Sequence, residues 1–292
     1  MSNVTTAPAA PPSARGPLRA RAAAENFPVA LRILPGITRR HLYALYRYAR
    51  FVDDLGDEPA LGLTAAERTA TLDAFEAEVR RLYNGRRVTH PVLSELAPTV
   101  VACELPVGPL LRLIEANRVD QAVSRYATFE DLVGYCSLSA NPVGELVLHV
   151  FGQADPLRVG LSDRICTALQ VVEHLQDLAE DHRRGRVYLP GADLDRFGVR
   201  EADLAAATAS DALRGLVRFE AGRAKTLLDA GSPLVATLRG WARVAVAGYL
   251  AGGYATLRAL RRSGYDPLPG PPRPRRLDIA ASWLAVMVRS IG

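Results

Sequence analysis

The sequence predicts an all-α fold in which helices pack around a sizeable core. Apolar residues recur every three or four positions, as in the segment 110–114, which is the period of a helix. No alternation of apolar and polar residues lasts long enough to build a sheet. Glycine and proline interrupt the pattern at short intervals, as helix ends do. The expected helices cover residues 38–57, 65–83, 91–103, 107–126, 129–152, 162–183, 210–230, 233–263 and 275–289.

The 292 residues suit one large domain or two small ones. Residues 1–24 are rich in Ala, Pro, Ser, Thr and Arg and lack a continuous apolar segment, so we expect a disordered tail. A single helical domain is expected over residues 25–292. Deleting residues 1–20 is therefore expected to change neither the melting temperature nor the activity.

The first predicted helix, residues 38–57, carries an acidic cluster at its end. Its carboxylates are Asp53, Asp54, Asp57 and Glu58. Tyr46 and Arg50 precede them at helical spacing on the same face, and the flanking residues are apolar or aromatic. Buried carboxylates repel one another unless a cation neutralises them. Mg²⁺ bound to a diphosphate fits such a cluster, although a solvated acidic helix end is the alternative.

The predicted helix 129–152 has clear signals at its start and in its middle. Thr128 precedes acidic residues in the first turn and is expected to cap the helix. Asn141 and Pro142 lie inside the apolar stretch that follows, and proline removes one helical hydrogen bond. Two interpretations stay open: a bent helix whose freed carbonyls face a cavity, or a loop between two shorter helices.

The predicted helix 162–183 repeats the acidic pattern of the first one. Glu173, Asp177 and Asp181 are spaced four residues apart and share one helix face. A basic and aromatic segment follows, with Arg183, Arg184, Arg186 and Tyr188. Acids that hold metal ions and arginines that hold phosphate oxygens together suit a metal–diphosphate complex. We expect the two acidic helices to face each other across the bundle and clamp one diphosphate through Mg²⁺.

Charge and composition indicate which classes of partner the protein could bind. The formal net charge is +5, but no basic stripe or aromatic platform supports binding to nucleic acid. Anionic membranes or anionic substrates explain the charge equally well. Ile279–Val288 is apolar but too short to span a bilayer, so at most it contacts a membrane interface. The three cysteines have no metal or redox spacing, which favours reduced thiols in a cytoplasmic protein.

Three long stretches, in order, resemble the squalene/phytoene synthase family. They are Tyr46–Glu58, Arg125–Cys136 and Gln170–Pro190, within a resemblance that covers about residues 25–262. Glu25–Pro28 and Ser139–Gly144 are most similar to the bacterial branch that makes hydroxysqualene for hopanoids. The resemblance implies an isoprenoid synthase helical bundle with a central cavity, Mg²⁺ as cofactor and a long isoprenoid diphosphate as substrate.

The resemblance also implies roles for individual residues. Metal and diphosphate positions are matched by Asp53, Asp54, Asp57, Glu173, Asp177 and Asp181. Substrate-binding positions are matched by Asn26, Phe27, Arg50, Gln170, Arg183 and Arg186. Tyrosines near the reacting carbons are matched by Tyr46, Tyr135, Tyr188 and Tyr254. Two departures are notable: many relatives have Asn in place of Glu173, and the segment 23–26 lacks the basic and hydroxyl groups of condensing relatives.

These observations lead to a functional hypothesis with two alternatives. The hypothesis is that presqualene diphosphate ionises, rearranges and is captured by water as hydroxysqualene, with Asn141 orienting that water. The first alternative is the head-to-head condensation of two prenyl diphosphates. The second is a catalytically silent assembly or lipid-carrier protein on the same fold. Peripheral contact with the inner face of the membrane and with neighbouring enzymes of the squalene pathway is also expected.

Overall fold

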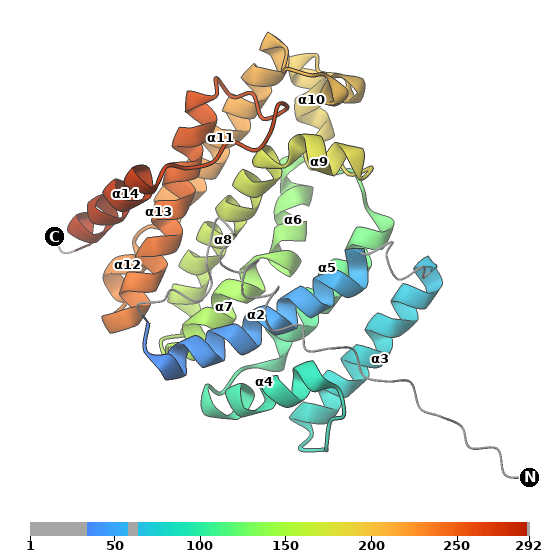
Figure 1. Ribbon diagram of the computed structural model, residues 1–292, viewed down its shortest axis with the longest axis vertical. Helices are drawn as coiled ribbons and strands as arrows, with labels where there is room; N and C mark the ends of the chain where they lie inside the picture. Colours follow the sequence, from blue (N-terminus) through green and yellow to red (C-terminus); the bar gives the residue numbers. More distant parts are fainter. Residues whose placement is uncertain (1–33, 58–63, 291–292) are drawn as a thin grey trace, which may run out of the picture.

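The computed structural model describes residues 34–57 and 64–290, and this part of the chain is helical (Figure 1). The predictions made for Asn26, Phe27 and Glu58 lie outside the described residues. The first helices are α2 (Gly36–Asp57), α3 (Ala65–Tyr83), α4 (Pro91–Ala102), α5 (Val107–Ala122), α6 (Phe129–Ser139) and α7 (Asn141–Val150). The later ones are α8 (Pro156–Gln176), α9 (Leu178–Arg183), α10 (Gly191–Phe197), η2 (Glu201–Ala205), α11 (Asp211–Gly231), α12 (Leu234–Thr237), α13 (Gly240–Arg262) and α14 (Arg276–Arg289).

The all-α prediction is confirmed, while three of the long predicted helices are divided. The expected helix 129–152 is two helices that meet at Ala140 without an intervening loop. Pro142 lies in the first turn of α7, where its missing N–H removes no helical hydrogen bond. The expected helix 162–183 begins earlier, at Pro156, and divides at Asp177. The expected helix 233–263 divides between Thr237 and Gly240.

Two short elements, α10 and η2, were not predicted. They contain only seven and five residues, too few for an apolar repeat to be recognised.

The predicted cap at the start of α6 is confirmed, because the Thr128 hydroxyl accepts a hydrogen bond from the Asp131 amide at 3.1 Å. The Asp131 carboxylate in turn accepts from the Thr128 amide at 2.9 Å, which completes a capping box.

Helix α8 lies in the middle of the bundle, with α6, α7, α11 and α13 packed against it (Figure 1). Buried residues of α8 and α11 form one large hydrophobic cluster together with α6. A second cluster joins α2, α3, α4 and α5. Because α8 contacts elements on several sides, most residues along its middle are buried or half-buried. No helix in the described part of the chain has both the length and the apolar character needed to cross a membrane.

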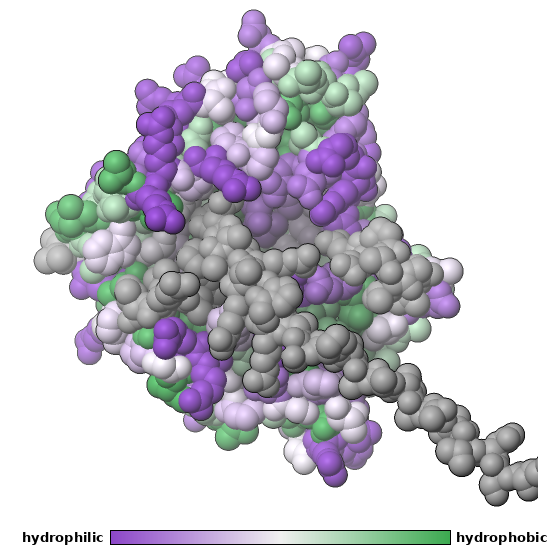
Figure 2. Space-filling model, in the orientation of Figure 1, coloured by the Kyte–Doolittle hydropathy of each residue, from purple (hydrophilic) through white to green (hydrophobic). Residues whose placement is uncertain are grey.

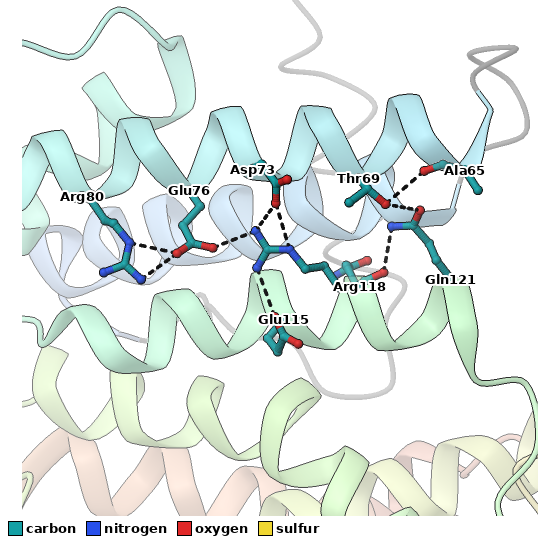
Figure 3. A network of polar contacts seen from close by, with 9 residues as sticks. Ala65, Thr69, Asp73, Glu76, Arg80, Glu115, Arg118 and Gln121 are labelled. Carbon is teal, nitrogen blue, oxygen red and sulfur yellow. Dashed lines mark hydrogen bonds and ion pairs between the residues drawn. The ribbon is translucent and has the colours of Figure 1, made fainter.

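Helix α3 is fixed to α5 by the guanidinium of Arg118 (Figure 3). It donates to Asp73 at 2.6 Å, to Glu76 at 2.7 Å and to Glu115 at 3.1 Å. These hydrogen bonds outweigh the opposing effect of burial and raise the pKa of Arg118, so the group stays charged. The network holds one face of α5 against α3 and leaves the positions on either side of Arg118 to face the rest of the molecule.

Candidate active site

The C-terminal end of α8 turns at Asp177 instead of continuing straight. The Asp177 amide donates to the Glu173 carbonyl at 2.9 Å, and the Asp181 amide donates to the Asp177 carbonyl at 2.8 Å. Hydrogen bonding therefore continues through the joint, although Asp177 itself departs from helical geometry. The half-buried carboxylates of Asp177 and Asp181 lie on the two helices that meet there.

The segment after α9 turns back towards the bundle at Gly185. Gly185 has φ +80°, a left-handed backbone conformation that favours glycine because glycine has no Cβ. The Val187 amide then donates to the Ser124 carbonyl at 2.9 Å, so the returning chain lies beside the segment before α6. Arg125 strengthens this contact by donating to the Gly185 carbonyl at 2.6 Å. The turn places Tyr188 against the end of α8.

Four aromatic rings gather beside this acidic end. The rings of His174 and Tyr188 stack with centroids 3.6 Å apart and an angle of 12° between planes. The Tyr188 ring also has two tyrosine neighbours, with centroid distances of 5.8 Å to Tyr126 and 5.9 Å to Tyr135. The hydroxyl of Tyr135 donates to the Asp120 carboxylate at 2.7 Å. The rings form a compact aromatic wall, with a carboxylate behind it on α5.

Burial keeps the phenols of this wall protonated. It raises the pKa of Tyr135 above its ordinary value, and the nearby Tyr188 and Asp120 raise it further. Burial likewise raises the pKa of Tyr188, with the charge of Asp120 as the next cause, while the Arg186 guanidinium opposes the shift. The hydroxyls therefore remain available as neutral hydrogen-bond partners at any ordinary pH.

The carboxylates at the α8–α9 joint repel one another. Burial raises the pKa of Asp177, and the charges of Asp181 and Glu180 raise it further. The only histidine of the aromatic wall lies beside them, with its Nδ1 3.7 Å from an Asp181 oxygen. The Nε2 of His174 is 3.2 Å from the Gln170 amide nitrogen. This joint is a place where a bound cation would lower the electrostatic energy.

The first acidic segment reaches the same region through α5. The Asn117 amide donates to an Asp53 oxygen at 3.4 Å, and Asp120 lies one turn further along α5. Asp54 forms an ion pair with Arg50 at 2.9 Å on the same helix. Helix α5 thus contacts the first acidic segment through Asn117 and the aromatic wall through Asp120. The wall in turn contacts Asp181 through His174.

A close approach of helices makes this connection possible. A Cβ on Gly56 would lie 2.0 Å from the Asn117 side-chain oxygen, so α2 carries glycine where it passes α5. Asn117 and Asp120 were not among the residues predicted for the site. Their spacing of three on a helix that follows the acidic segment is a signal that was present in the sequence.

The structure groups some predicted site residues and separates others. Tyr135, Tyr188 and Gln170 belong to the wall or contact it, and the charge of Arg186 acts on Tyr126 and Tyr188. Tyr46 is buried on α2, where its ring packs edge-on to Tyr43. Asp57 ends α2, and its side chain is not described.

Of three other predicted residues, one is bonded to α11 and two are exposed. Tyr254 directs its hydroxyl to Asp229 on α11, at 2.8 Å. Glu173 and Arg183 are exposed on α8 and α9. In place of Tyr254, the neighbouring Tyr249 lines an apolar cavity described next.

An apolar cavity of about 110 Å³ lies between α7, α8 and α13. Its wall includes Val147, Ile165, Leu169, Val246 and Tyr249. Leu169 in its wall is about 12 Å from Asp177 along α8. One helix therefore carries an apolar pocket along its length and carboxylates at its end, which suits an elongated molecule with a hydrocarbon chain and an anionic head.

Asn141 lies next to this cavity at the start of α7. It is buried, and its side-chain oxygen accepts a hydrogen bond from the Thr167 hydroxyl on α8 at 3.0 Å. Val143 and Gly144, which follow it, belong to the cavity wall. The division between α6 and α7 thus places an amide beside an apolar pocket.

The donor set fits Mg²⁺ that shares its ligands with a phosphate. Among the described residues no group of three His, Cys, Asp or Glu side chains is gathered closely enough to hold an ion without help. Mg²⁺ usually takes one or two carboxylates from a protein and completes its octahedron with water and substrate phosphates. Two oxygen-donor segments with crowded charge, on opposite sides of the aromatic wall, meet that requirement.

Comparison with known proteins supplies an independent result. Residues 20–282 match the family model described as squalene/phytoene synthase. A hydroxysqualene synthase from Rhodopseudomonas palustris is 36% identical over 217 residues, which is 74% of this chain and 72% of the relative. A 15-cis-phytoene synthase from Synechococcus elongatus is 32% identical over 220 residues, which is 70% of this chain and 70% of the relative. The crystal structure of squalene synthase HpnC from Alicyclobacillus acidocaldarius superposes with a TM-score of 0.74, at 45% identity over 80% of this chain and 87% of that one.

Proposed function

The chain belongs to the squalene/phytoene synthase family, and we propose that within it the protein converts presqualene diphosphate to hydroxysqualene. Membership makes it an enzyme that acts on prenyl diphosphates. The observation that carries the finer proposal is the aromatic wall formed by Tyr126, Tyr135, His174 and Tyr188 beside the acidic joint. Such a wall suits a reaction that creates a carbocation next to a departing diphosphate.

The diphosphate would lie between the two acidic segments. Asp53 and Asp54 on one side, and Asp177 and Asp181 on the other, would hold Mg²⁺. When bound, the metal would supply charge neutralisation for the leaving group. Arg186 lies close enough to act on the pKa of Tyr188, and its guanidinium would bind phosphate oxygens in the same region.

The aromatic wall would then stabilise and orient the cation. The ring of Tyr135 offers π density, and cations are attracted to such faces within about 6 Å of the ring centre. Tyr188, which stacks on His174, supports the wall from behind. Asp120 fixes the Tyr135 hydroxyl, so the ring is positioned before the reaction starts. The hydrocarbon chains would occupy the cavity between α7, α8 and α13, where water is scarce.

Capture by water requires a polar group beside this apolar space. Asn141 is suited to it, because Thr167 holds the side-chain oxygen and thereby aims the NH₂ group away from that bond. An oriented amide would bind one water molecule without admitting bulk solvent. The proposed branch is also supported by the 36% identity to a protein named hydroxysqualene synthase.

Product analysis tests the proposal. With Mg²⁺ and without NADPH, presqualene diphosphate should give an alcohol that carries oxygen from labelled water. The Asn141→Ala variant should shift products from this alcohol to unhydroxylated hydrocarbons, while Thr226→Ala, a threonine on the exposed side of α11, should not. Formation of squalene only on addition of NADPH would contradict the proposal.

The second candidate is head-to-head condensation of two prenyl diphosphates. Its support is the relative named 15-cis-phytoene synthase, whose 32% identity is close to that of the hydroxysqualene synthase. Incubation with farnesyl diphosphate or geranylgeranyl diphosphate alone separates the two candidates. Accumulation of presqualene diphosphate or phytoene would favour condensation, whereas unchanged substrate would favour the first proposal.

A further inference from the structure

The C-terminal helix α14 exposes an apolar face that no other described element covers. Leu277, Leu284 and Val288 are 83%, 61% and 61% exposed. Ala280, Ala281 and Ala285 are exposed between them. With 3.6 residues per turn these six positions form one continuous stripe along the helix. Figure 2 shows hydrophobic atoms at the left edge of the molecule, where α14 lies in Figure 1.

Arginines flank this stripe on both sides. Arg276 and Arg289 are each one residue from its ends and so lie about 100° around the helix, on opposite edges of the stripe. Arg273 and Arg275 are exposed in the connection that leads into the helix. From residue 273 to residue 290 there are four arginines and one acid, Asp278, so the segment carries a net charge of +3. Asp278 is itself paired with Arg262 at 2.7 Å.

The opposite face of α14 belongs to the hydrophobic cluster around the apolar cavity between α7, α8 and α13. Val286, Trp283 and Met287 pack in the same cluster as Ile165 and Val246, two residues of the cavity wall. The Trp283 ring nitrogen also donates to the Val244 carbonyl on α13 at 3.3 Å. In the described part of the chain, α13 therefore lies between α14 and the cavity.

We propose that α14 docks this enzyme on anionic phospholipid membranes, with its apolar stripe in the interface and its arginines on the headgroups. An amphipathic helix with an apolar face and basic edges lies flat in the interface and needs no span. The charge favours an anionic lipid surface over an apolar protein surface, because each arginine near such a surface gains attraction from it. Docking would hold the cavity side of the molecule near the bilayer, whichever prenyl diphosphate is the substrate.

Sedimentation of the full chain with lipid vesicles tests the proposal. The parent should bind vesicles of phosphatidylcholine mixed with phosphatidylglycerol and bind phosphatidylcholine alone much less. The double variant Leu277→Ser, Leu284→Ser should lose about tenfold in partitioning. The pair Arg276→Gln, Arg289→Gln should weaken binding to the anionic vesicles and reduce its dependence on salt.

Two control variants make the same kinds of substitution at exposed positions outside α14. Val101→Ser removes an aliphatic side chain that is 79% exposed on α4, and Arg86→Gln removes an exposed charge after α3. Both should bind vesicles as the parent does. Unaltered activity and melting temperature in the α14 variants would show that the fold is intact. Failure of the parent to bind anionic vesicles would overturn the proposal, as would light scattering that shows a dimer in the parent and a monomer in the Leu277→Ser, Leu284→Ser variant.

Discussion

At the scale of single residues, the site depends on side chains whose partners come from other helices. Tyr135 on α6 is fixed by Asp120 on α5, and His174 on α8 is covered by Tyr188 from the loop after α9. Each group has a neighbour that limits its rotamers. Single substitutions at such positions should affect turnover more than folding.

Replacing Tyr135 by phenylalanine removes only the hydroxyl that donates to Asp120. We expect turnover to fall by about tenfold or more, because the ring loses its fixed orientation and the local charge is rearranged. Tyr83→Phe is the matched control, since that hydroxyl donates to the Leu105 carbonyl at 2.9 Å, between α3 and the residues that follow α4. Steady-state kinetics and thermal melts of both variants measure the effect. Equal loss of turnover in the two variants would contradict a local role for Tyr135.

Replacing Asp177 by asparagine should separate activity from stability. Turnover should fall by orders of magnitude, because the variant loses a proposed metal ligand. The melting temperature of the metal-free protein should stay unchanged or rise, since burial and the charges of Asp181 and Glu180 already disfavour the carboxylate. Asp195→Asn, at an exposed position on α10, serves as control. Activity within a few-fold of the parent would exclude the two-segment clamp.

At the scale of elements, the site is assembled by the crossing of α2 and α5. Gly56 allows the two helices to come close, and Asn117 on α5 donates a hydrogen bond to Asp53 on α2. Arg118 holds α5 against α3 (Figure 3). The acidic segment of α2 is therefore positioned by helix packing as well as by its own sequence.

Adding a methyl group at Gly56 should disturb this crossing. Gly56→Ala places a Cβ 2.0 Å from the Asn117 oxygen, so we expect a loss of about 1–3 kcal/mol in stability and weaker binding of a diphosphate analogue. Gly222→Ala on α11 meets no atom within 4 Å and should gain up to about 1 kcal/mol from helix propensity. Chemical denaturation and calorimetric titration measure the two quantities. A stabilised Gly56→Ala variant would show that α2 and α5 are further apart than described.

At the scale of the whole molecule, one buried carboxylate couples stability to pH. Glu220 on α11 is 1% exposed and accepts from Arg223 at 2.8 Å, and Arg223 also pairs with Asp193. Burial raises the pKa of Glu220 to about 7, against the opposing charge of Arg223. The folded state thus keeps a proton that the unfolded state releases near its ordinary pKa.

Stability should therefore fall as pH rises from about 4.5 to 7, and this contribution should be constant above that range. Glu220→Gln removes the contribution, so its unfolding free energy relative to the parent should increase across the same window by up to about 3 kcal/mol. Glu130→Gln, an exposed residue on α6, should show no such trend. Denaturant unfolding at several pH values measures the difference, and parallel curves for Glu220→Gln and the parent would contradict the assigned pKa.

The sequence by itself determined the helical class, most helix positions and the two acidic segments. These features are local: they follow from a repeat of three to four residues and from carboxylates spaced along one helix. The matched family confirms the fold that those segments predicted.

Tertiary structure decided which groups face one another. It placed Asn117 and Asp120 between the acidic segments, moved Tyr254 towards α11, and brought His174 against Tyr188. It also divided the expected helices at Ala140 and Asp177, although hydrogen bonding continues across both breaks. Pro142 indicated the first break in the sequence, whereas neither glycine nor proline marks the second. The physical reason is that a helical repeat fixes which residues share a face, whereas only packing against other helices fixes what that face meets.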